Sequence, residues 1–287
     1  MKLLPSGSAT VCGIIGQPVS HSLSPWMHQQ FAQQFGLDFL YAPFPVAKAS
    51  LATALRGMQA LGLRGCNVTI PHKENLLPLL GDITPRAKAI GAVNTLVFGD
   101  TGILGDNTDG IGFERALRRH GVALQGPSLI IGAGGAARAI LQALGECGAT
   151  PIYLANRTVQ RAQHLATEFP HLPLVALPLE AAALSALLPE IQLLVNTTSR
   201  GLQGENHPEI HLEQLPSSCV LCDIVYKPLQ TPLLSAAAAR GLHCVDGLGM
   251  LVEQGAESFR IWTGQMPETA AVEDLLREWL SHPNSQP

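Results

Sequence analysis

Four short polar stretches carry the side chains best suited to bind a small molecule. They are residues 21–25 (HSLSP), 67–73 (NVTIPHK), 92–96 (AVNTL) and 105–110 (GDNTDG), and each adjoins an apolar run. Hydroxyls, amides, a lysine and acidic groups at loop ends favour a pocket for a polyhydroxylated, anionic small molecule. Taken singly, the stretches have simpler interpretations: Ser24 before Pro25 could cap a helix, and the last stretch could be a turn.

A glycine-rich stretch, residues 132–137 (GAGGAA), follows an apolar run and opens a helical pattern. It fits G-x-G-x-x-A, in which Gly132 permits the turn, Gly134 lets the backbone approach a pyrophosphate, and Ala137 packs the helix on the strand. The N-terminus of the helix adds unpaired N–H groups and the positive end of its dipole. The pattern therefore predicts a dinucleotide site, although such turns also occur without ligands.

The end of the next strand, residues 154–158 (LANRT), indicates which dinucleotide is bound. Domains that prefer NAD usually place Asp or Glu here to bond the ribose 2′-hydroxyl, and this stretch has neither. Arg157 and Arg161 would instead suit a 2′-phosphate, so NADP is favoured over NAD. The alternative is that both are solvated surface arginines.

Lys73 and Asp109 are the candidates for the chemical step. Hydride delivery to a ketone creates a developing alkoxide, which needs a proton or a positive charge within hydrogen-bond reach. Lysine supplies both, and a neighbouring aspartate can hold the ammonium and share a substrate hydroxyl. General acid–base catalysis by Lys73 and purely electrostatic stabilisation both remain open.

Composition excludes several classes. The 18 Lys and Arg against 22 Asp and Glu give a net charge of -4, which does not favour nucleic-acid binding. With 46% hydrophobic and 14% charged residues, the chain can bury large cores. It has no run of about 18 uncharged apolar residues and no signal-peptide pattern, so we expect a cytoplasmic protein that neither spans nor binds a membrane. No His, Cys or Asp spacing suits a metal site.

Short apolar strands alternate with amphipathic helical stretches, which predicts α/β architecture with mostly parallel sheets in two lobes. The predicted strands are 11–15, 39–44, 65–70, 128–131, 151–155, 174–176, 193–196 and 220–224, with a further segment at 90–97 that leads into a turn at 99–102. The predicted helices are 25–35, 51–61, 110–120, 136–147, 159–169, 181–188, 250–262 and 270–279.

Seven ordered motifs give a resemblance to the shikimate dehydrogenase family, which includes shikimate/quinate dehydrogenases. They are SHSLSP at 20–25, NVTIPHK at 67–73, AVNT at 92–95, NTDG at 107–110, GAGGAA at 132–137, NRT at 156–158 and DGLGMLVEQGAESF at 246–259. The resemblance implies an NADP-dependent oxidoreductase that interconverts 3-dehydroshikimate and shikimate in aromatic amino-acid biosynthesis. It also implies a substrate-binding lobe at 1–108 plus 247–287, a Rossmann-type NADP-binding lobe at 109–246, and a cleft between them.

The resemblance further implies a role for each matching position. The residues expected to bind the substrate are Ser22 and Ser24 for its carboxylate, Thr69, Asn94, Asp109 and Gln254 for its ring hydroxyls, the pocket tyrosine Tyr226, and the catalytic Lys73 with Asp109. The residues expected to bind the cofactor are Gly132, Ala133, Gly134, Gly135, Ala136, Asn156, Arg157, Thr158, Arg161, Ile224 and Gly247. One departure is residues 196–201 (NTTSRG), where Arg200 adds a charge near the expected cofactor edge.

Two other functions remain open at this point. A quinate/shikimate dehydrogenase would admit an extra ring hydroxyl or use NAD, and the pocket residues alone do not separate the substrates. A non-catalytic sensor of shikimate-type metabolites would be expected to lack Lys73 or Asp109, or to carry a DNA-binding segment. The chain retains both residues, and 287 residues leave no room for a third domain. The expected partner is a small molecule, and the chain is expected to be a monomer or homodimer.

Overall fold

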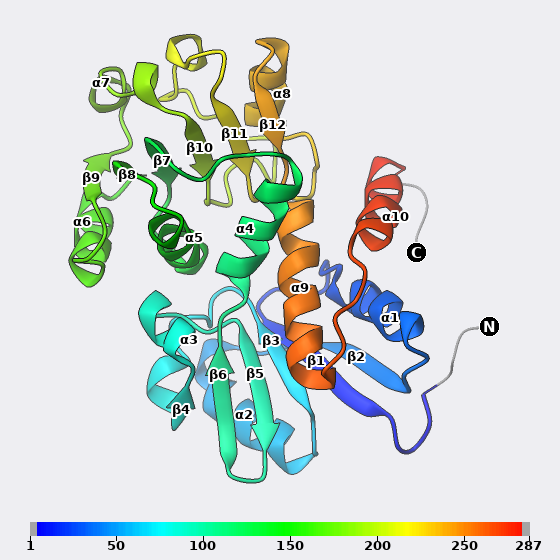
Figure 1. Cartoon of the computed structure of the whole chain (residues 1–287). Coiled ribbons are helices and arrows are strands. Elements are labelled where there is room, and N and C mark those ends of the chain that lie inside the picture. The colour runs from blue at the N-terminus through cyan, green and yellow to red at the C-terminus, as the bar shows by residue number, and fades with distance from the viewer. Residues whose placement is uncertain (1–4, 283–287) are drawn as a thin grey trace. The chain divides into compact units, whose positions relative to one another are not determined.

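The computed structural model describes residues 5–282, which form two compact units (Figure 1). The first unit comprises residues 5–112 and 252–276, and the second comprises residues 113–251 and 277–282. Within the described residues the chain passes between them inside three helices, α4 (Asp109–Arg119), α9 (Leu248–Thr263) and α10 (Ala270–Ser281). The lobe boundaries expected from the sequence, at 108/109 and 246/247, lie a few residues before the crossings in α4 and α9 and remain a proposal.

A six-stranded mixed sheet forms the centre of the first unit, in the order β2-β1-β3-β5-β6-β4. Its strands are β1 (Thr10–Gly16), β2 (Phe39–Pro45), β3 (Gly65–Val68), β4 (Asp82–Ile83), β5 (Thr95–Gly99) and β6 (Gly102–Asp106). β1 runs parallel to β2 and β3, whereas β5 is antiparallel to both β3 and β6. The carboxyl ends of β1 and β3 therefore meet at one edge, where the first two polar stretches begin.

The prediction of a single segment over residues 90–97 is wrong. Residues Pro85–Ile90 form helix α3, and β5 begins only at Thr95. Local signals explain the helix: the Thr84 hydroxyl accepts from the Ala87 N–H, Pro85 occupies the first turn, and Gly91 ends the helix at φ +69°. Within this unit the other helices are α1 (Ser24–Gln34), α2 (Leu51–Ala60) and the first part of α10 (Ala270–Ser281).

The second unit is built on an entirely parallel sheet in the order β12-β11-β10-β7-β8-β9. Its strands are β7 (Ser128–Ile131), β8 (Ile152–Asn156), β9 (Leu174–Pro178), β10 (Leu193–Asn196), β11 (Val220–Asp223) and β12 (His243–Val245). The connecting helices are α5 (Gly135–Glu146), α6 (Val159–Glu168), α7 (Ala181–Leu184) and α8 (Pro232–Ala239). The chain order reverses between β7 and β10, and ligands of such sheets bind at the carboxyl ends of the strands beside that point.

Apolar side chains cover both faces of this parallel sheet. Ile130 and Val195 pack with the helices α5 and α6 on one face, and Leu129 and Leu194 pack with α8 on the other. Burial on both faces explains why these strands read as continuous apolar runs in the sequence. The sequence predicted neither α8 nor β12.

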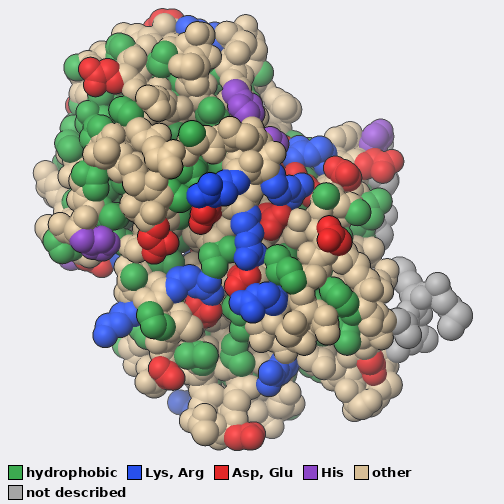
Figure 2. All heavy atoms as spheres, in the orientation of Figure 1, with side chains coloured by type: hydrophobic (Ala, Val, Ile, Leu, Met, Phe, Trp, Pro, Cys, Tyr) green, Lys and Arg blue, Asp and Glu red, His purple; other side chains and the backbone are tan. Residues whose placement is uncertain are grey.

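Basic and acidic side chains lie next to one another on the face shown in Figure 2, in keeping with the small net charge. In the part of the chain from residue 5 to 282, no helix combines the length and the apolar character needed to cross a bilayer.

Candidate active site

Lys73 and Asp109 form an ion pair in the first unit. Lys73 lies in the loop after β3, and its Nζ contacts Oδ2 of Asp109, the first residue of α4. The Lys73 side chain is 18% exposed and that of Asp109 is 6% exposed, so the pair is shielded yet reachable from one side. A carboxylate in the first turn of a helix is further stabilised by the helix dipole. The geometry places a positively charged proton donor beside a fixed acceptor.

The Asn94 side chain holds the other oxygen of Asp109. Asn94 Nδ2 donates to Asp109 Oδ1 at 2.7 Å, and Asn94 Oδ1 accepts from the backbone N–H of Thr108 at 2.8 Å. Because a backbone N–H can only donate, this second bond fixes which end of the amide is oxygen. Gln254 Oε1, on α9, lies 3.4 Å from the same Nδ2. Four predicted substrate-binding residues, Lys73, Asn94, Asp109 and Gln254, are therefore brought together.

A glycine allows α4 and α9 to approach closely enough for this grouping. A Cβ on Gly112 would lie 2.7 Å from both Cβ and the backbone nitrogen of Gln254. Any side chain at position 112 would push Gln254 away from Asn94 and Asp109.

The two serines and Thr69 lie at the edge formed by the carboxyl ends of β1 and β3. Ser24 is the buried first residue of α1, and its N–H donates to Ser22 Oγ at 3.2 Å. Ser24 does not cap the helix, since the N-cap is Leu23 and makes no side-chain cap bond. Thr69 N donates to Ile15 O at 2.9 Å, which ties the Thr69 loop to the end of β1. The three hydroxyls thus belong to neighbouring loops.

Tyr226 lies in the second unit, in the segment that follows β11, and burial raises the pKa of its phenol. Its part in substrate binding remains a prediction.

The glycine-rich turn in the second unit has the shape that a pyrophosphate needs. Gly132 has φ +105°, and a Cβ there would lie 2.6 Å from Thr197 Oγ1 and 2.9 Å from Thr198 Cγ2. Gly134 is the N-cap of α5, and apart from the adjoining backbone no atom lies within 4 Å of the position that a Cβ would occupy. The turn therefore packs tightly at its first glycine and leaves open space beside the N-terminus of α5.

The arginines expected to bind the adenosine phosphate are exposed on the neighbouring segment. Asn156 ends β8, and its Nδ2 donates to Thr158 O at 2.8 Å, which shapes the turn into α6. The Arg161 guanidinium reaches Ala133 O in the glycine-rich turn at 3.4 Å. Within residues 5–282, Arg157 makes no hydrogen bond or ion pair, so its charge is available to a ligand. Two arginines flanking this turn fit a phosphate on the adenosine ribose.

Ile224 and Gly247, expected to line the nicotinamide, are in contact with each other. A Cβ on Gly247 would lie 2.0 Å from Ile224 O, and Gly247 N donates to Val225 O at 3.2 Å. Only glycine permits this approach of the two backbones.

Residues 196–201, which depart from the pattern of the resembled family, form local contacts within the second unit. The Thr197 hydroxyl donates to Ile131 O at 2.7 Å, and Arg200 forms an ion pair with Glu209 at 2.5 Å. The added charge is therefore paired within the loop.

Sequence reasoning assigned no role to a group of buried polar residues behind Asn94. The group comprises Tyr41, Asn67, Thr95, Thr108 and Ser258, each buried and hydrogen-bonded to another member. One signal for Ser258 is its position four residues after Gln254, which places both on the same face of a helix.

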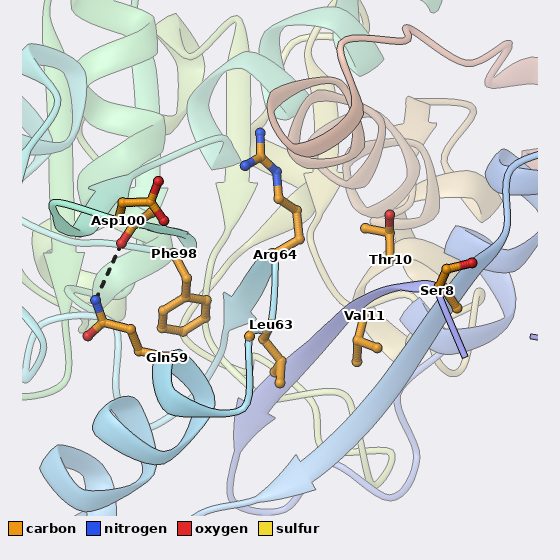
Figure 3. Close-up of a pocket in the computed structure, with 11 residues that line it drawn as sticks. Ser8, Thr10, Val11, Gln59, Leu63, Arg64, Phe98 and Asp100 are labelled. Atoms are coloured by element: carbon orange, nitrogen blue, oxygen red, sulfur yellow. Dashed lines mark hydrogen bonds between the residues drawn. The ribbon is translucent and has the colours of Figure 1, made fainter. Parts of the chain in front are cut away.

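A cavity of about 370 Å³ lies elsewhere in the first unit (Figure 3). Residues at the start of β1 and β3 and the end of β5 line it, among them Thr10, Arg64 and Asp100. The cavity lies at the amino ends of β1 and β3, whereas the Lys73 loop lies beyond the carboxyl end of β3. The two ends of β1, a strand of seven residues, are about 20 Å apart. None of the predicted site residues lines this cavity.

Three family models match consecutive parts of the chain. The shikimate dehydrogenase substrate binding domain matches residues 14–96, shikimate / quinate 5-dehydrogenase matches 115–225, and the shikimate 5′-dehydrogenase C-terminal domain matches 247–277. The shikimate dehydrogenase (NADP+) of Acidiphilium cryptum is 46% identical over 275 residues, which cover 96% of this chain and 96% of that protein. The chain belongs to the shikimate dehydrogenase family. The resemblance drawn from the seven motifs is confirmed.

Solved members of the family share the fold. Shikimate 5-dehydrogenase from Thermus thermophilus, in complex with NADP(H) and shikimate, is 40% identical with a TM-score of 0.83 and covers 93% of this chain and 98% of its own. Quinate dehydrogenase from Corynebacterium glutamicum, in complex with NAD, is 30% identical with a TM-score of 0.86 and covers 94% and 99%. The predicted α/β class with two lobes is therefore confirmed.

Proposed function

We propose that the chain catalyses the reversible NADPH-dependent reduction of 3-dehydroshikimate to shikimate, a step of aromatic amino-acid biosynthesis. The observation that carries the proposal is the contact of the Lys73 ammonium with the Asp109 carboxylate, beside the Asn94 and Gln254 side chains. The relatives indicate the substrate, since the Acidiphilium protein is a shikimate dehydrogenase (NADP+) and the Thermus enzyme was solved with shikimate and NADP(H).

The chemical step needs a proton at the substrate oxygen. When bound, the nucleotide supplies or accepts the hydride. Lys73 donates a proton to the oxygen as the carbonyl becomes an alcohol, and takes it back in the reverse direction. Asp109 accepts hydrogen bonds from the Lys73 ammonium and from a substrate hydroxyl, so it orients both.

Binding uses the remaining polar groups of the first unit. The hydroxyls of Ser22 and Ser24 donate hydrogen bonds to the substrate carboxylate. Thr69, Asn94 and Gln254 form hydrogen bonds with the ring hydroxyls. Neutral donors suit a small carboxylate that must also leave the site as product.

The glycine-rich turn would hold the pyrophosphate, with Arg157 and Arg161 on the ribose 2′-phosphate. The support for this assignment is the open space at Gly134 and the two exposed guanidiniums beside the turn. Ile224 and Gly247 would present backbone atoms to the nicotinamide. The proposal includes a cytoplasmic enzyme that is a monomer or homodimer, which light scattering of the purified chain would distinguish.

The proposal is tested by following NADP reduction with shikimate, beside quinate and beside NAD. Activity with shikimate and NADP, with the other pairs at least about tenfold lower in kcat/KM, is the expected result. Comparable activity with quinate or NAD would move the chain to the dual-specificity branch of the family. Binding of shikimate without turnover by any pair would favour the metabolite sensor instead.

A further inference from the structure

A row of buried polar side chains ends on the Asp109 carboxylate. The side chains come from β2, β3, β5, the residue before β5, and α9, all in the first unit, and every one is at most 5% exposed. The members in order are Tyr41, Asn67, Ser258, Thr95 and Asn94, which we call the donor relay.

The first half of the donor relay runs from Tyr41 to Ser258. The Tyr41 hydroxyl donates to Asn67 Oδ1 at 2.8 Å, and Asn67 Nδ2 donates to Ser258 Oγ at 2.9 Å. An amide that accepts on its oxygen and donates from its nitrogen passes the polarisation of one bond to the next.

In the second half of the donor relay, counting protons fixes the direction of the bond from Thr95 to Asn94. Thr95 has a single hydroxyl proton. Its Oγ1 lies 2.7 Å from Asn94 Oδ1, which can only accept, so Thr95 donates to Asn94. Ser258 Oγ lies 2.8 Å from Thr95 Oγ1 and 3.0 Å from the backbone oxygen of Gln254, and its single proton can be donated to either of them. Asn94 then donates to Asp109 Oδ1. Thr95 and Asn94 therefore each donate towards the carboxylate, while Ser258 Oγ accepts from Asn67 and contacts Thr95.

We propose that Thr95 and Ser258 are positioning residues that hold Asp109, through Asn94, as an acceptor-only carboxylate turned towards Lys73. Neither touches the substrate; they act by fixing the Asn94 amide, whose nitrogen must face Asp109. The inference rests on the proposed function, because the consequence of a misplaced Asp109 is read in shikimate turnover.

The test compares two substitutions of Thr95. Thr95→Val keeps the shape and removes the hydroxyl, whereas Thr95→Ser keeps the hydroxyl and removes a methyl group. Thr95→Val should lower kcat for shikimate oxidation about tenfold, and Thr95→Ser less than about threefold. The dissociation constant of shikimate, measured by calorimetry without nucleotide, should change less than about threefold for both. Equal kcat in the valine and serine variants would overturn the proposal.

A second position guards against misfolding of the valine variant. Ser258→Ala should reproduce the loss of kcat, and Thr263→Val is its control on the same helix. Thr263 makes the same kind of back-bond, to Phe259 O at 2.8 Å, as Ser258 makes to Gln254 O at 3.0 Å, but it lies outside the relay. An equal loss of kcat in the Thr263 variant would contradict a role specific to the relay.

A double-mutant cycle shows whether the relay acts through Asp109. In an Asp109→Asn background, Thr95→Val should change kcat less than about twofold, because the acceptor that the relay holds has been removed. A full tenfold effect in that background would overturn the proposal. If the wild type fails to oxidise shikimate, the proposed function fails, and the relay is judged from urea unfolding. Non-additive effects of Thr95→Val and Asp109→Asn on stability would then support it, and additive effects would overturn it.

Discussion

Asn94 and Lys73 take different oxygens of the Asp109 carboxylate. Asn94 Nδ2 lies 2.7 Å from Oδ1, and the Lys73 ammonium contacts Oδ2. Both oxygens therefore already accept a hydrogen bond from the protein. Of the two members of the ion pair, Lys73 is the one that carries a proton to give.

Replacement of Lys73 by alanine should reduce turnover far more than binding. We expect kcat for shikimate oxidation to fall by about 100-fold or more, since general acid–base groups contribute about 10²–10⁴-fold. Shikimate affinity should fall less than about tenfold, because Asn94, Gln254 and the serines remain. The measurement is steady-state kinetics together with calorimetric titration of shikimate. Unchanged kcat would exclude Lys73 from the chemical step.

The two glycines of the dinucleotide turn should respond differently to alanine. Gly132→Ala should destabilise the fold by about 2 kcal/mol or more, because its φ is positive and its Cβ would clash with Thr197. Gly134→Ala should fold normally, since its φ is -116° and the space beside it is open. The added methyl group would nevertheless occupy the place proposed for the pyrophosphate.

Thermal unfolding and NADP titration of both variants check this pair of expectations. Gly134→Ala should keep the wild-type melting temperature and bind NADP at least about tenfold more weakly. Wild-type affinity in this variant would show that the nucleotide does not approach the turn at Gly134.

The paired substitution of Arg157 and Arg161 by alanine should shift the choice of nucleotide. The KM for NADP should rise about 10- to 100-fold, while the KM for NAD stays within about threefold, because only NADP carries the 2′-phosphate. Arg118→Ala is a matched control, since Arg118 contacts Cys147 at the far end of α5, about 18 Å from the turn. An equal rise in both KM values would assign the two arginines to another part of the nucleotide.

Buried His28 should make the stability of the protein fall in acid. His28 is fully buried and stacks on Tyr41 with ring centroids 4.2 Å apart. Burial lowers its pKa from 6.5 to about 3, against a smaller opposing effect of the Asn67 amide. Below about pH 6.5 the unfolded chain therefore binds a proton that the folded chain does not. His28 thus contributes a loss of unfolding free energy of up to about 1.4 kcal/mol per pH unit, down to about pH 3.

Urea unfolding between about pH 6 and pH 4 tests this expectation. His28→Phe keeps an aromatic ring against Tyr41 and should flatten the pH dependence by about that slope. His120→Asn, at an exposed position, should leave the slope unchanged. If the phenylalanine variant kept the wild-type slope, His28 would not be the group responsible.

Local patterns were enough to predict the dinucleotide turn, because a strand, three glycines and a helix start lie within a few consecutive residues. The start and stop signals of α3, Thr84, Pro85 and Gly91, are equally local, yet the apolar residues from Ile90 to Val97 masked them. The donor relay is different. Thr95 and Ser258 are 163 residues apart, and only the packing of α9 against β5 turns their hydroxyls towards each other. No pattern in the sequence shows which neighbour a buried hydroxyl faces.

The discontinuity of the first unit has a consequence for how the protein is made. Its Lys73–Asp109 ion pair can form once residue 109 has been translated, but Gln254 and Ser258 leave the ribosome only after the whole parallel sheet of the second unit. Domains generally fold as units during synthesis, so the second unit can fold while the first still lacks α9. Until then Asn67 and Thr95 face no Ser258, and the nascent chain has Lys73 and Asp109 before it has the α9 side chains that complete the donor relay.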